Sequence, residues 1–274
     1  MILIADSGST KTDWLLLPAA KDIHTPGINP VHQSPDAIRS SLPVVTETVR
    51  AVYFYGAGCT PERIPLMTQL LQTHFPDAYV EVQSDLLGAA RALCGRQEGI
   101  ACILGTGANS GLYDGERIVQ NTPALGYILG DEGSGAVLGK CFLNAIFKCP
   151  DFATLRDDYL SSVQLTQADI IQRVYREPMA NRFLASTSLY IGKHLDHPLL
   201  SQLVIDNFRQ FFRRNLLPYG RRDLPVGVVG SMGYHYRNQL AKAARQEGFR
   251  LGTVIKSPME GLVAYHGSTC HADM

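Results

Sequence analysis

Apolar positions along the chain follow two periodicities, one typical of strands and one typical of helices. Short β-branched or aromatic runs bounded by turn residues predict strands at 2–5, 12–17, 50–55, 78–83, 100–104, 224–230 and 251–256. Apolar residues at three-to-four spacing predict helices at 61–75, 86–93, 134–147 and 237–247, and almost continuous amphipathic helix over 151–220. Because strands and helices alternate, the pattern indicates an α/β fold.

Two stretches of the chain begin in the same way. A strand, a turn rich in glycine and hydroxyl side chains, and a second strand occur over 2–17 and again from residue 100. The stretches do not match residue for residue, so we expect a structural repeat rather than a sequence repeat. Two α/β halves are therefore predicted, with a ligand cleft between them.

Length and charge narrow the classes of partner. The 274 residues suffice for two modest domains, and a formal net charge of +0 provides no long-range field to attract nucleic acid or anionic lipid. Residues 1–17 resemble neither a signal peptide nor a membrane anchor. The six scattered cysteines form no C-x-x-C pair, which indicates a reduced, cytoplasmic protein. We expect a small-molecule partner, with no nucleic acid and no membrane.

Three glycine-containing turns follow predicted strands. They read DSGSTKT (6–12), GTGANSG (105–111) and GSMG (230–233). Glycines let the backbone approach an anion, and Ser and Thr hydroxyls add donors, so such turns can bind phosphate. Each turn alone is more often a plain hairpin, but three in one chain favour a nucleotide site.

Five motifs in order carry a resemblance to a known family. DSGSTKT, SDLLGAA, GTGANSG, GDEGSG and VGSMG resemble the BadF/BadG/BcrA/BcrD ATPase family of the sugar kinase–Hsp70–actin superfamily, and within it the N-acetylglucosamine kinases. The resemblance covers essentially the whole chain, with residues 150–220 the least diagnostic. It implies two RNase H-like (actin/hexokinase-type) domains closing on ATP. We place them at 1–97, with a helix over 258–274 packing back on it, and at 98–257, with a helical insertion over 151–220.

The resemblance also implies an activity and its residues. The activity is ATP- and Mg²⁺-dependent phosphorylation of an amino sugar, above all N-acetylglucosamine at its 6-hydroxyl, by a homodimer. Asp85 would accept the proton of the sugar hydroxyl, and Asp6 would hold Mg²⁺ through water. The implied nucleotide-binding residues are Gly8, Ser9, Thr10, Lys11, Gly105, Thr106, Gly230, Ser231 and Met232. The implied substrate-binding residues are Asn29, Gly107, Asn109, Asp131 and Glu132.

Five of the polar candidates also have a purely structural interpretation. Asp85 can cap a helix, and Lys11 can be a solvated strand residue. Asn29 can form a turn beside Pro30, and the acidic pair 131–132 can simply favour a helix N-terminus. Of that pair, Asp131 is the residue expected to bind the sugar hydroxyls, whereas Glu132 can brace the loop or contact the sugar secondarily.

Alternatives remain open for both the substrate and the class of activity. Mammalian N-acetylglucosamine kinases carry Gly-Trp shortly before the GDEG loop, where this chain has Ala124-Leu125, so glucosamine and N-acetylmuramic acid stay open as substrates. The same family includes ATPase activators of acyl-CoA dehydratases and reductases, which hold an iron–sulfur cluster between two subunits. Cys102 and Cys141 are the cysteines that this alternative would use. A sugar-responsive repressor would need a helix-turn-helix ahead of the first strand, which is expected to begin at Ile2.

Overall fold

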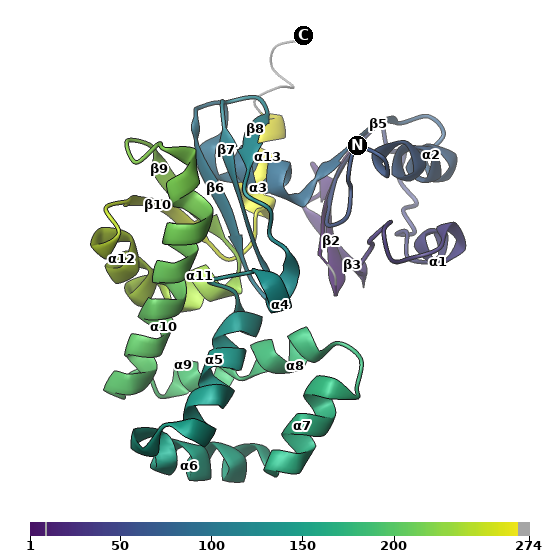
Figure 1. Ribbon diagram of the computed structural model, residues 1–274. Coiled ribbons are helices and arrows are strands. Elements are labelled where there is room, and N and C mark those ends of the chain that lie inside the picture. The colour runs from purple at the N-terminus through teal and green to yellow at the C-terminus, as the bar shows by residue number, and fades with distance from the viewer. Residues whose placement is uncertain (9, 268–274) are drawn as a thin grey trace. The chain divides into compact units, whose positions relative to one another are not determined.

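The computed structural model describes residues 1–8 and 10–267, which divide into two compact units (Figure 1). Unit 1 comprises Met1–Gln97, Asp114–Ile118 and the chain from Ser257 on, and unit 2 comprises Glu98–Tyr113 and Val119–Lys256. Ser9 and the part of the predicted C-terminal helix beyond Gly267 lie outside the described residues.

Unit 1 is built on a mixed five-stranded sheet in the order β3-β2-β1-β4-β5. Strand β1 pairs antiparallel with β2, and β2 with β3, whereas β1, β4 and β5 run parallel. The elements are β1 (Ile2–Ser7), β2 (Lys11–Leu17), β3 (Lys21–Pro26), α1 (Pro35–Ser40), β4 (Ala51–Gly56), α2 (Ile64–His74), β5 (Tyr79–Ser84), α3 (Asp85–Cys94) and α13 (Met259–Gly267).

Helices cover both faces of this sheet. Alternation along β1 places Leu3 and Ala5 in the core under α1 and α2, while Ile4 packs on the opposite face with Tyr55 and Leu262 (Figure 1). On that second face α13 lies against α3, so the end of the described chain stabilises the helix that begins at Asp85.

Unit 2 repeats the same topology, with strand order β10-β9-β6-β7-β8. Strand β6 pairs antiparallel with β7 and parallel with β9, which pairs parallel with β10. The strands are β6 (Gly99–Leu104), β7 (Ala108–Tyr113), β8 (Ile118–Asn121), β9 (Pro225–Val229) and β10 (Arg250–Ile255). In each unit the first strand has its hairpin partner on one side and the fourth strand on the other. The predicted structural repeat and the α/β fold class are confirmed.

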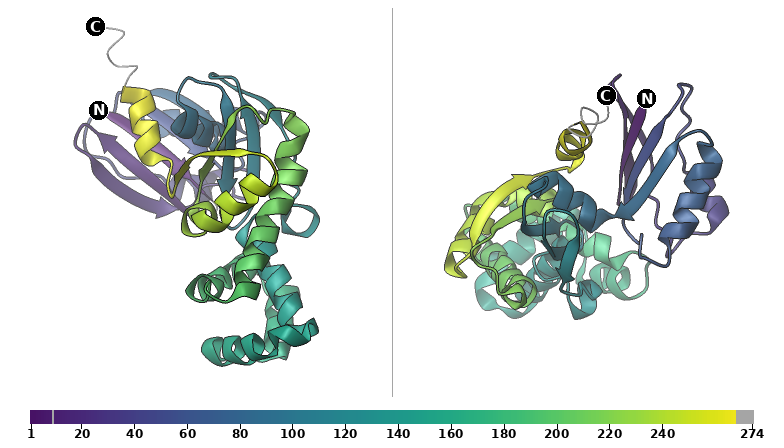
Figure 2. Two further views of the ribbon diagram at one scale, coloured as in Figure 1. Left: turned by 90° about the vertical axis from the view of Figure 1, so that its left-hand side faces the viewer. Right: turned by 90° about the horizontal axis from the view of Figure 1, so that it is seen from above.

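The helices of unit 2 share one apolar core with its strands. They are α4 (Gly126–Leu129), α5 (Gly135–Lys148), η1 (Pro150–Phe152), α6 (Ala153–Val163), α7 (Gln167–Tyr175), α8 (Ala180–Ser186), α9 (Ser188–Lys193), α10 (Pro198–Phe211), the π-helical turn η2 (Phe212–Leu216), η3 (Leu217–Tyr219), α11 (Ser231–His235) and α12 (Arg237–Gln246). Within this unit α6 and α7 lie beyond α5 and α8, on the side away from the sheet (Figure 1), and Figure 2 shows the same helical part from two other sides. Phe208, Phe211 and Phe212 are fully buried where α10 passes into η2.

Two elements of unit 1 were not expected from the sequence. Strand β3 lies at the sheet edge and is largely exposed, so it lacks the apolar alternation that predicts a strand. Helix α1 has only six residues, with Ser34 as its N-cap and Pro35 at its first position, in a stretch where no helix was predicted.

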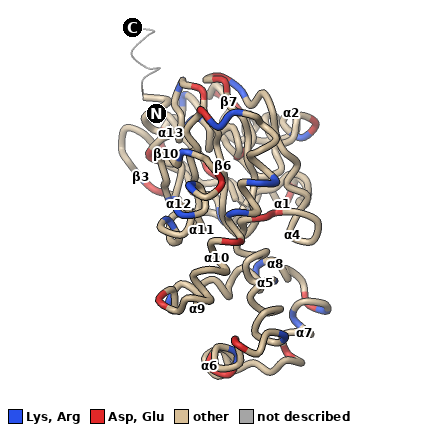
Figure 3. The backbone as a smooth tube through the Cα atoms, turned by 60° about the vertical axis from the view of Figure 1, so that its left-hand side comes forward, with Lys and Arg blue, Asp and Glu red and all other residues tan. Residues whose placement is uncertain are grey.

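Charge and apolarity of the described residues agree with the balanced composition. Acidic and basic positions are interspersed along the backbone of each unit (Figure 3). Within residues 1–8 and 10–267, none of the helices combines the length and the apolar character that a bilayer-spanning segment needs.

Candidate active site

The GTG turn of unit 2 is fixed against the start of helix α5. The amide of Gly105 donates to the carbonyl of Gly107 over 3.0 Å, which closes the turn after β6. The carbonyls of Gly105 and Thr106 accept from the amides of Gly135 (2.8 Å) and Ala136 (3.1 Å). Ser134 caps the helix by accepting from the amide of Val137. Two predicted motifs, GTGANSG and GDEGSG, therefore form one structure.

The GSMG turn joins the same structure from strand β9. Gly230 has φ +121°, and a Cβ there would lie 2.3 Å from the carbonyl oxygen of Leu104, so only glycine fits beside the end of β6. Ser231 is exposed at the start of α11, whereas Met232 is buried close to Gly135. The structure thus brings together three of the predicted motifs within unit 2.

Asp131 is held beside the GTG turn. Its carboxylate accepts from the amides of Ala108 and Gly126, and a Cβ on Gly107 would lie 3.0 Å from its Oδ2. Partial burial and the neighbouring Glu132 charge raise the pKa of Asp131, and the two amide hydrogen bonds oppose this shift. The backbone of Asp131 has a left-handed φ of +55°, which is strained for a non-glycine residue.

Glu132 points to a different set of partners. Its Oε2 accepts from Nδ2 of Asn215 over 3.3 Å, and its Oε1 lies 3.5 Å from Nη1 of Arg214. The next turn of the loop is held by Asn207, whose Oδ1 accepts from the amide of Gly133 and whose Nδ2 donates to the carbonyl of Ser134, both over 3.2 Å.

Asn207, Arg214 and Asn215 were missed by the sequence analysis. The available signal was an asparagine at position 207 among the apolar positions of an amphipathic helix.

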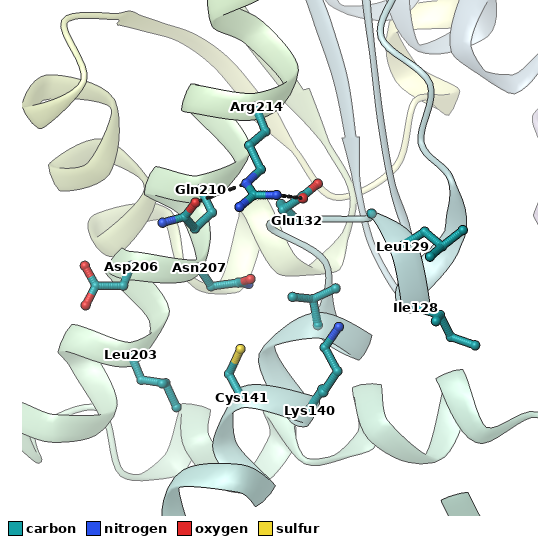
Figure 4. Close-up of a pocket in the computed structure, with 12 residues that line it drawn as sticks. Ile128, Leu129, Glu132, Lys140, Cys141, Leu203, Asp206, Asn207, Gln210 and Arg214 are labelled. Carbon is teal, nitrogen blue, oxygen red and sulfur yellow. Dashed lines mark hydrogen bonds and ion pairs between the residues drawn. The ribbon is translucent and has the colours of Figure 1, made fainter. Parts of the chain in front are cut away.

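A cavity of about 410 Å³ opens beside this loop (Figure 4). Its walls come from α4, α5 and the α10–η2 helix, with apolar side chains such as Leu129 next to Glu132, Arg214 and Lys140. Arg214 extends toward Glu132 and Gln210, and Cys141 lies on the α5 wall (Figure 4).

Asn109 is the second residue of strand β7, which follows the GTG turn. Its Oδ1 accepts from the amide of Ser110 over 2.9 Å and from Nδ2 of Asn121 over 3.0 Å. These bonds fix the carboxamide orientation at the start of β7.

In unit 1 the first glycine turn uses some of its hydroxyls internally. Ser7 and Thr12 are buried and hydrogen-bonded to each other over 2.6 Å, which locks the β1–β2 hairpin. Gly8 and Thr10 are exposed, so both can contact a ligand. Lys11 is also exposed, and its Nζ pairs with Asp13 at 2.7 Å, in line with a solvated strand residue.

Asp6 and Asp85 are brought together in unit 1. Asp6 lies near the end of β1, and Asp85 is the first residue of α3, after β5. Burial and the charges of Asp85 and Asp13 raise the pKa of Asp6 to about 7. Burial also raises the pKa of Asp85, although its Oδ1 accepts from the amide of Leu86 over 2.8 Å. Two desolvated carboxylates therefore share one electrostatic environment.

The structure excludes the helix-cap interpretation for Asp85 and supports the turn interpretation for Asn29. Ser84, not Asp85, is the N-cap of α3, because its hydroxyl accepts from the amide of Leu87. Asn29 does form a turn, with Oδ1 accepting from the amide of Val31 over 3.0 Å. Its side chain also lies against Gly58, where a Cβ would come within 2.1 Å of Oδ1.

Comparison with solved structures identifies the family. A protein named "putative N-acetylglucosamine kinase" from Porphyromonas gingivalis is 48% identical to this chain. The match covers 98% of this chain and 100% of that one, with a TM-score of 0.92. The chain belongs to the BadF-type sugar kinase family. The resemblance read from the five motifs is thereby confirmed.

More distant structures share only the fold of this BadF-type chain. A second "putative N-acetylglucosamine kinase", from Chromobacterium violaceum, is 19% identical over 96% of this chain and 98% of its own, with a TM-score of 0.68. A ROK hexokinase from Thermus thermophilus is 13% identical over 99% of both chains, with a TM-score of 0.52. No protein-family model and no curated protein matches the chain.

Proposed function

We propose that this protein is an ATP-dependent amino-sugar kinase that phosphorylates N-acetylglucosamine at its 6-hydroxyl. The observation that carries the proposal is a pair of open glycines, Gly8 after β1 and Gly105 after β6, at equivalent places in the two units. The name of the Porphyromonas protein, at 48% identity over nearly the whole chain, supports the choice of substrate.

The open glycines favour a phosphate ligand because no described residue requires glycine there. Among the residues that the structure describes, a Cβ on Gly105 would meet no atom within 4 Å, and one on Gly8 would meet the Lys11 carbonyl at 3.8 Å. Neither residue has the positive φ that demands glycine. A missing side chain that neither packing nor backbone geometry explains leaves room for close backbone approach to a ligand. We assign that ligand as the phosphate chain of ATP.

The carboxylates of unit 1 suit the transfer step. Asp85 is not occupied as the helix cap, and burial raises its pKa, which makes the carboxylate a stronger proton acceptor. We assign it as the group that orients the sugar 6-hydroxyl and takes its proton.

The carboxylates of the GDEGSG loop in unit 2 suit sugar binding. We assign Asp131 and Glu132 to the sugar hydroxyls, since both present carboxylate oxygens from a loop fixed by the contacts described above.

Mg²⁺ fits the residues that are present. Magnesium binds through one or two carboxylates and substrate phosphates rather than in a cage made only of protein ligands. Asp6, partly buried and unfavourably close to the Asp85 charge, is the carboxylate that a divalent cation would stabilise. When bound, the ion neutralises negative charge on the phosphates.

The iron–sulfur alternative is less well supported by the structure. Cys102 is fully buried in the central strand β6, whereas Cys141 is exposed on α5. A cluster that bridges two subunits needs thiolates that reach the surface, and a buried Cys102 thiol does not meet that need.

The deciding experiment measures ADP release over a panel of hexoses and amino sugars. We expect the highest kcat/KM with N-acetylglucosamine, and the panel includes glucosamine and N-acetylmuramic acid as the open alternatives. Product phosphorylated at the 6-position is identified by NMR. If no member of the panel accelerates ADP release, the protein is not a sugar kinase.

We expect the substitution Asp6→Asn to raise thermal stability at pH 8 in the absence of ligands, by roughly 5 °C. The raised pKa, about 7 against the ordinary 3.8, means that between these values the folded state binds a proton that the unfolded state has released. Stability of the wild type therefore falls as the pH rises through this window, and the loss is complete above it. Because the Asn variant has no such loss, its advantage should shrink toward pH 5 in thermal melts. An advantage independent of pH would contradict the carboxylate environment described here.

A further inference from the structure

Helix α10 and the turn η2 present two buried asparagines to the same loop. Asn207 is 5% exposed and Asn215 is 4% exposed. Asn207 bonds to the backbone of Gly133 and Ser134, and Asn215 bonds to the carboxylate of Glu132. Buried carboxamides are retained where their hydrogen bonds are satisfied, and here the GDEGSG loop satisfies them.

The π-helical turn explains why both asparagines face the loop. In a regular α-helix the residue two turns after Asn207 is Arg214, at i+7. The wider turn η2 (Phe212–Leu216) accommodates one more residue, so Asn215 takes this place on the helix face. The backbone of Asn215 is fixed as well, because its carbonyl accepts from the hydroxyl of Thr122 over 2.8 Å.

We propose that Asn215 and Arg214, placed by the π-helical turn, are positioning residues that set the orientation of Glu132 for sugar binding. This inference rests on the proposed function, because it assigns Glu132 to the sugar. Asn215 donates to one carboxylate oxygen and Arg214 pairs with the other, so the Glu132 side chain has one preferred orientation. Asn207 fixes the backbone of the next two residues and so the base of the loop.

The substitution Asn215→Asp tests the assignment with little change in shape. It replaces the donor at Glu132 by a second carboxylate, so Glu132 should turn away from its position. We expect KM for the sugar to rise about tenfold to hundredfold, the range for a hydrogen bond to a charged group. KM for ATP should stay within twofold, because the hydrogen bonds that join the GTG turn to this loop start at Gly135 and Ala136 and not at Glu132. A role only in stability would change both constants together.

Arg214 and Arg213 provide a matched pair that avoids a buried substitution. Arg214 pairs with Glu132, whereas its neighbour Arg213 pairs with Glu247 at 2.7 Å. Both are at least partly exposed, so Arg214→Gln and Arg213→Gln should fold alike. Only Arg214→Gln is expected to raise KM for the sugar, and equal effects of the two substitutions would overturn the proposal.

A donor–acceptor exchange completes the test. In the double variant Glu132→Gln with Asn215→Asp, the new amide can donate to the new carboxylate, which restores a hydrogen bond with reversed roles. The double variant should therefore bind sugar more tightly than the two single changes predict by addition, and strict additivity would refute the coupling. The wild-type sugar panel reports on the proposed function alone, whereas the ratio of variant to wild type reports on positioning.

Discussion

The substitution Asp85→Asn is expected to give a folded protein whose kcat at saturating sugar falls by about 10²–10⁴, the usual range for loss of general-base assistance. The carboxamide keeps the shape of the side chain and can still accept from the amide of Leu86, but it cannot take a proton. ATP affinity should change little, because the substitution leaves both glycine turns intact.

The melting temperature distinguishes a catalytic role of Asp85 from a purely structural one. Burial raises the pKa of Asp85, so its charged form is disfavoured in the folded state, and removing the charge should maintain or increase the melting temperature. Ser84→Ala is the matched control one residue earlier. It removes the true N-cap and should cost about 0.5–2 kcal/mol of stability while turnover is largely retained. Wild-type turnover in Asp85→Asn would eliminate Asp85 as the base.

Apolar runs bounded by turn residues, together with the glycine turns, were enough to predict the inner strands of the sheets from the sequence. In β2 the residues Trp14–Leu17 are all apolar, and in the structure Thr12, Trp14 and Leu16 are buried while their neighbours are not. The order of the five motifs was sufficient to identify the family, and a structure at 48% identity confirmed it. The edge strand β3 could not be predicted because pairing with β2, rather than an apolar face, stabilises it.

The supporting residues of the site depend on tertiary geometry that no local pattern records. Glu132 and Gly133 are visible as part of a motif, but their partners Asn215 and Asn207 lie 83 and 74 residues further along the chain. Asn215 faces the loop only because η2 has π-helical geometry, whereas an α-helical reading of the sequence gives that place to Arg214. Likewise, Ser84 and Asp85 are adjacent polar residues at a helix start, and only the hydrogen bonds show which one caps.

A graded series at Gly105 should abolish nucleotide binding without harming the fold. Because a Cβ at this position meets no atom of the described residues within 4 Å and φ is not positive, Gly105→Ala and Gly105→Val are expected to melt within about 2 °C of the wild type. The added atoms would occupy the space in which the backbone approaches the phosphates. We therefore expect ATP affinity to fall by about tenfold with Ala and a hundredfold or more with Val, while sugar affinity falls far less. Calorimetric titration of each ligand separately measures both.

A substitution at Gly139 is the control for this series, because it is expected to lower stability and leave ATP affinity unchanged. There a Cβ would lie 2.0 Å from the carbonyl oxygen of Leu184, where α5 and α8 pack closely. Gly139→Ala should therefore cost about 1–3 kcal/mol of stability by overpacking, with ATP affinity unchanged in the fraction that is folded. If Gly105→Val instead lost stability and kept its affinity for ATP, the open glycine would be a structural feature and the nucleotide assignment would fail. If both affinities fell equally, the turn would position the whole site rather than contact phosphate. The expected result is a stable protein that binds sugar and does not bind ATP.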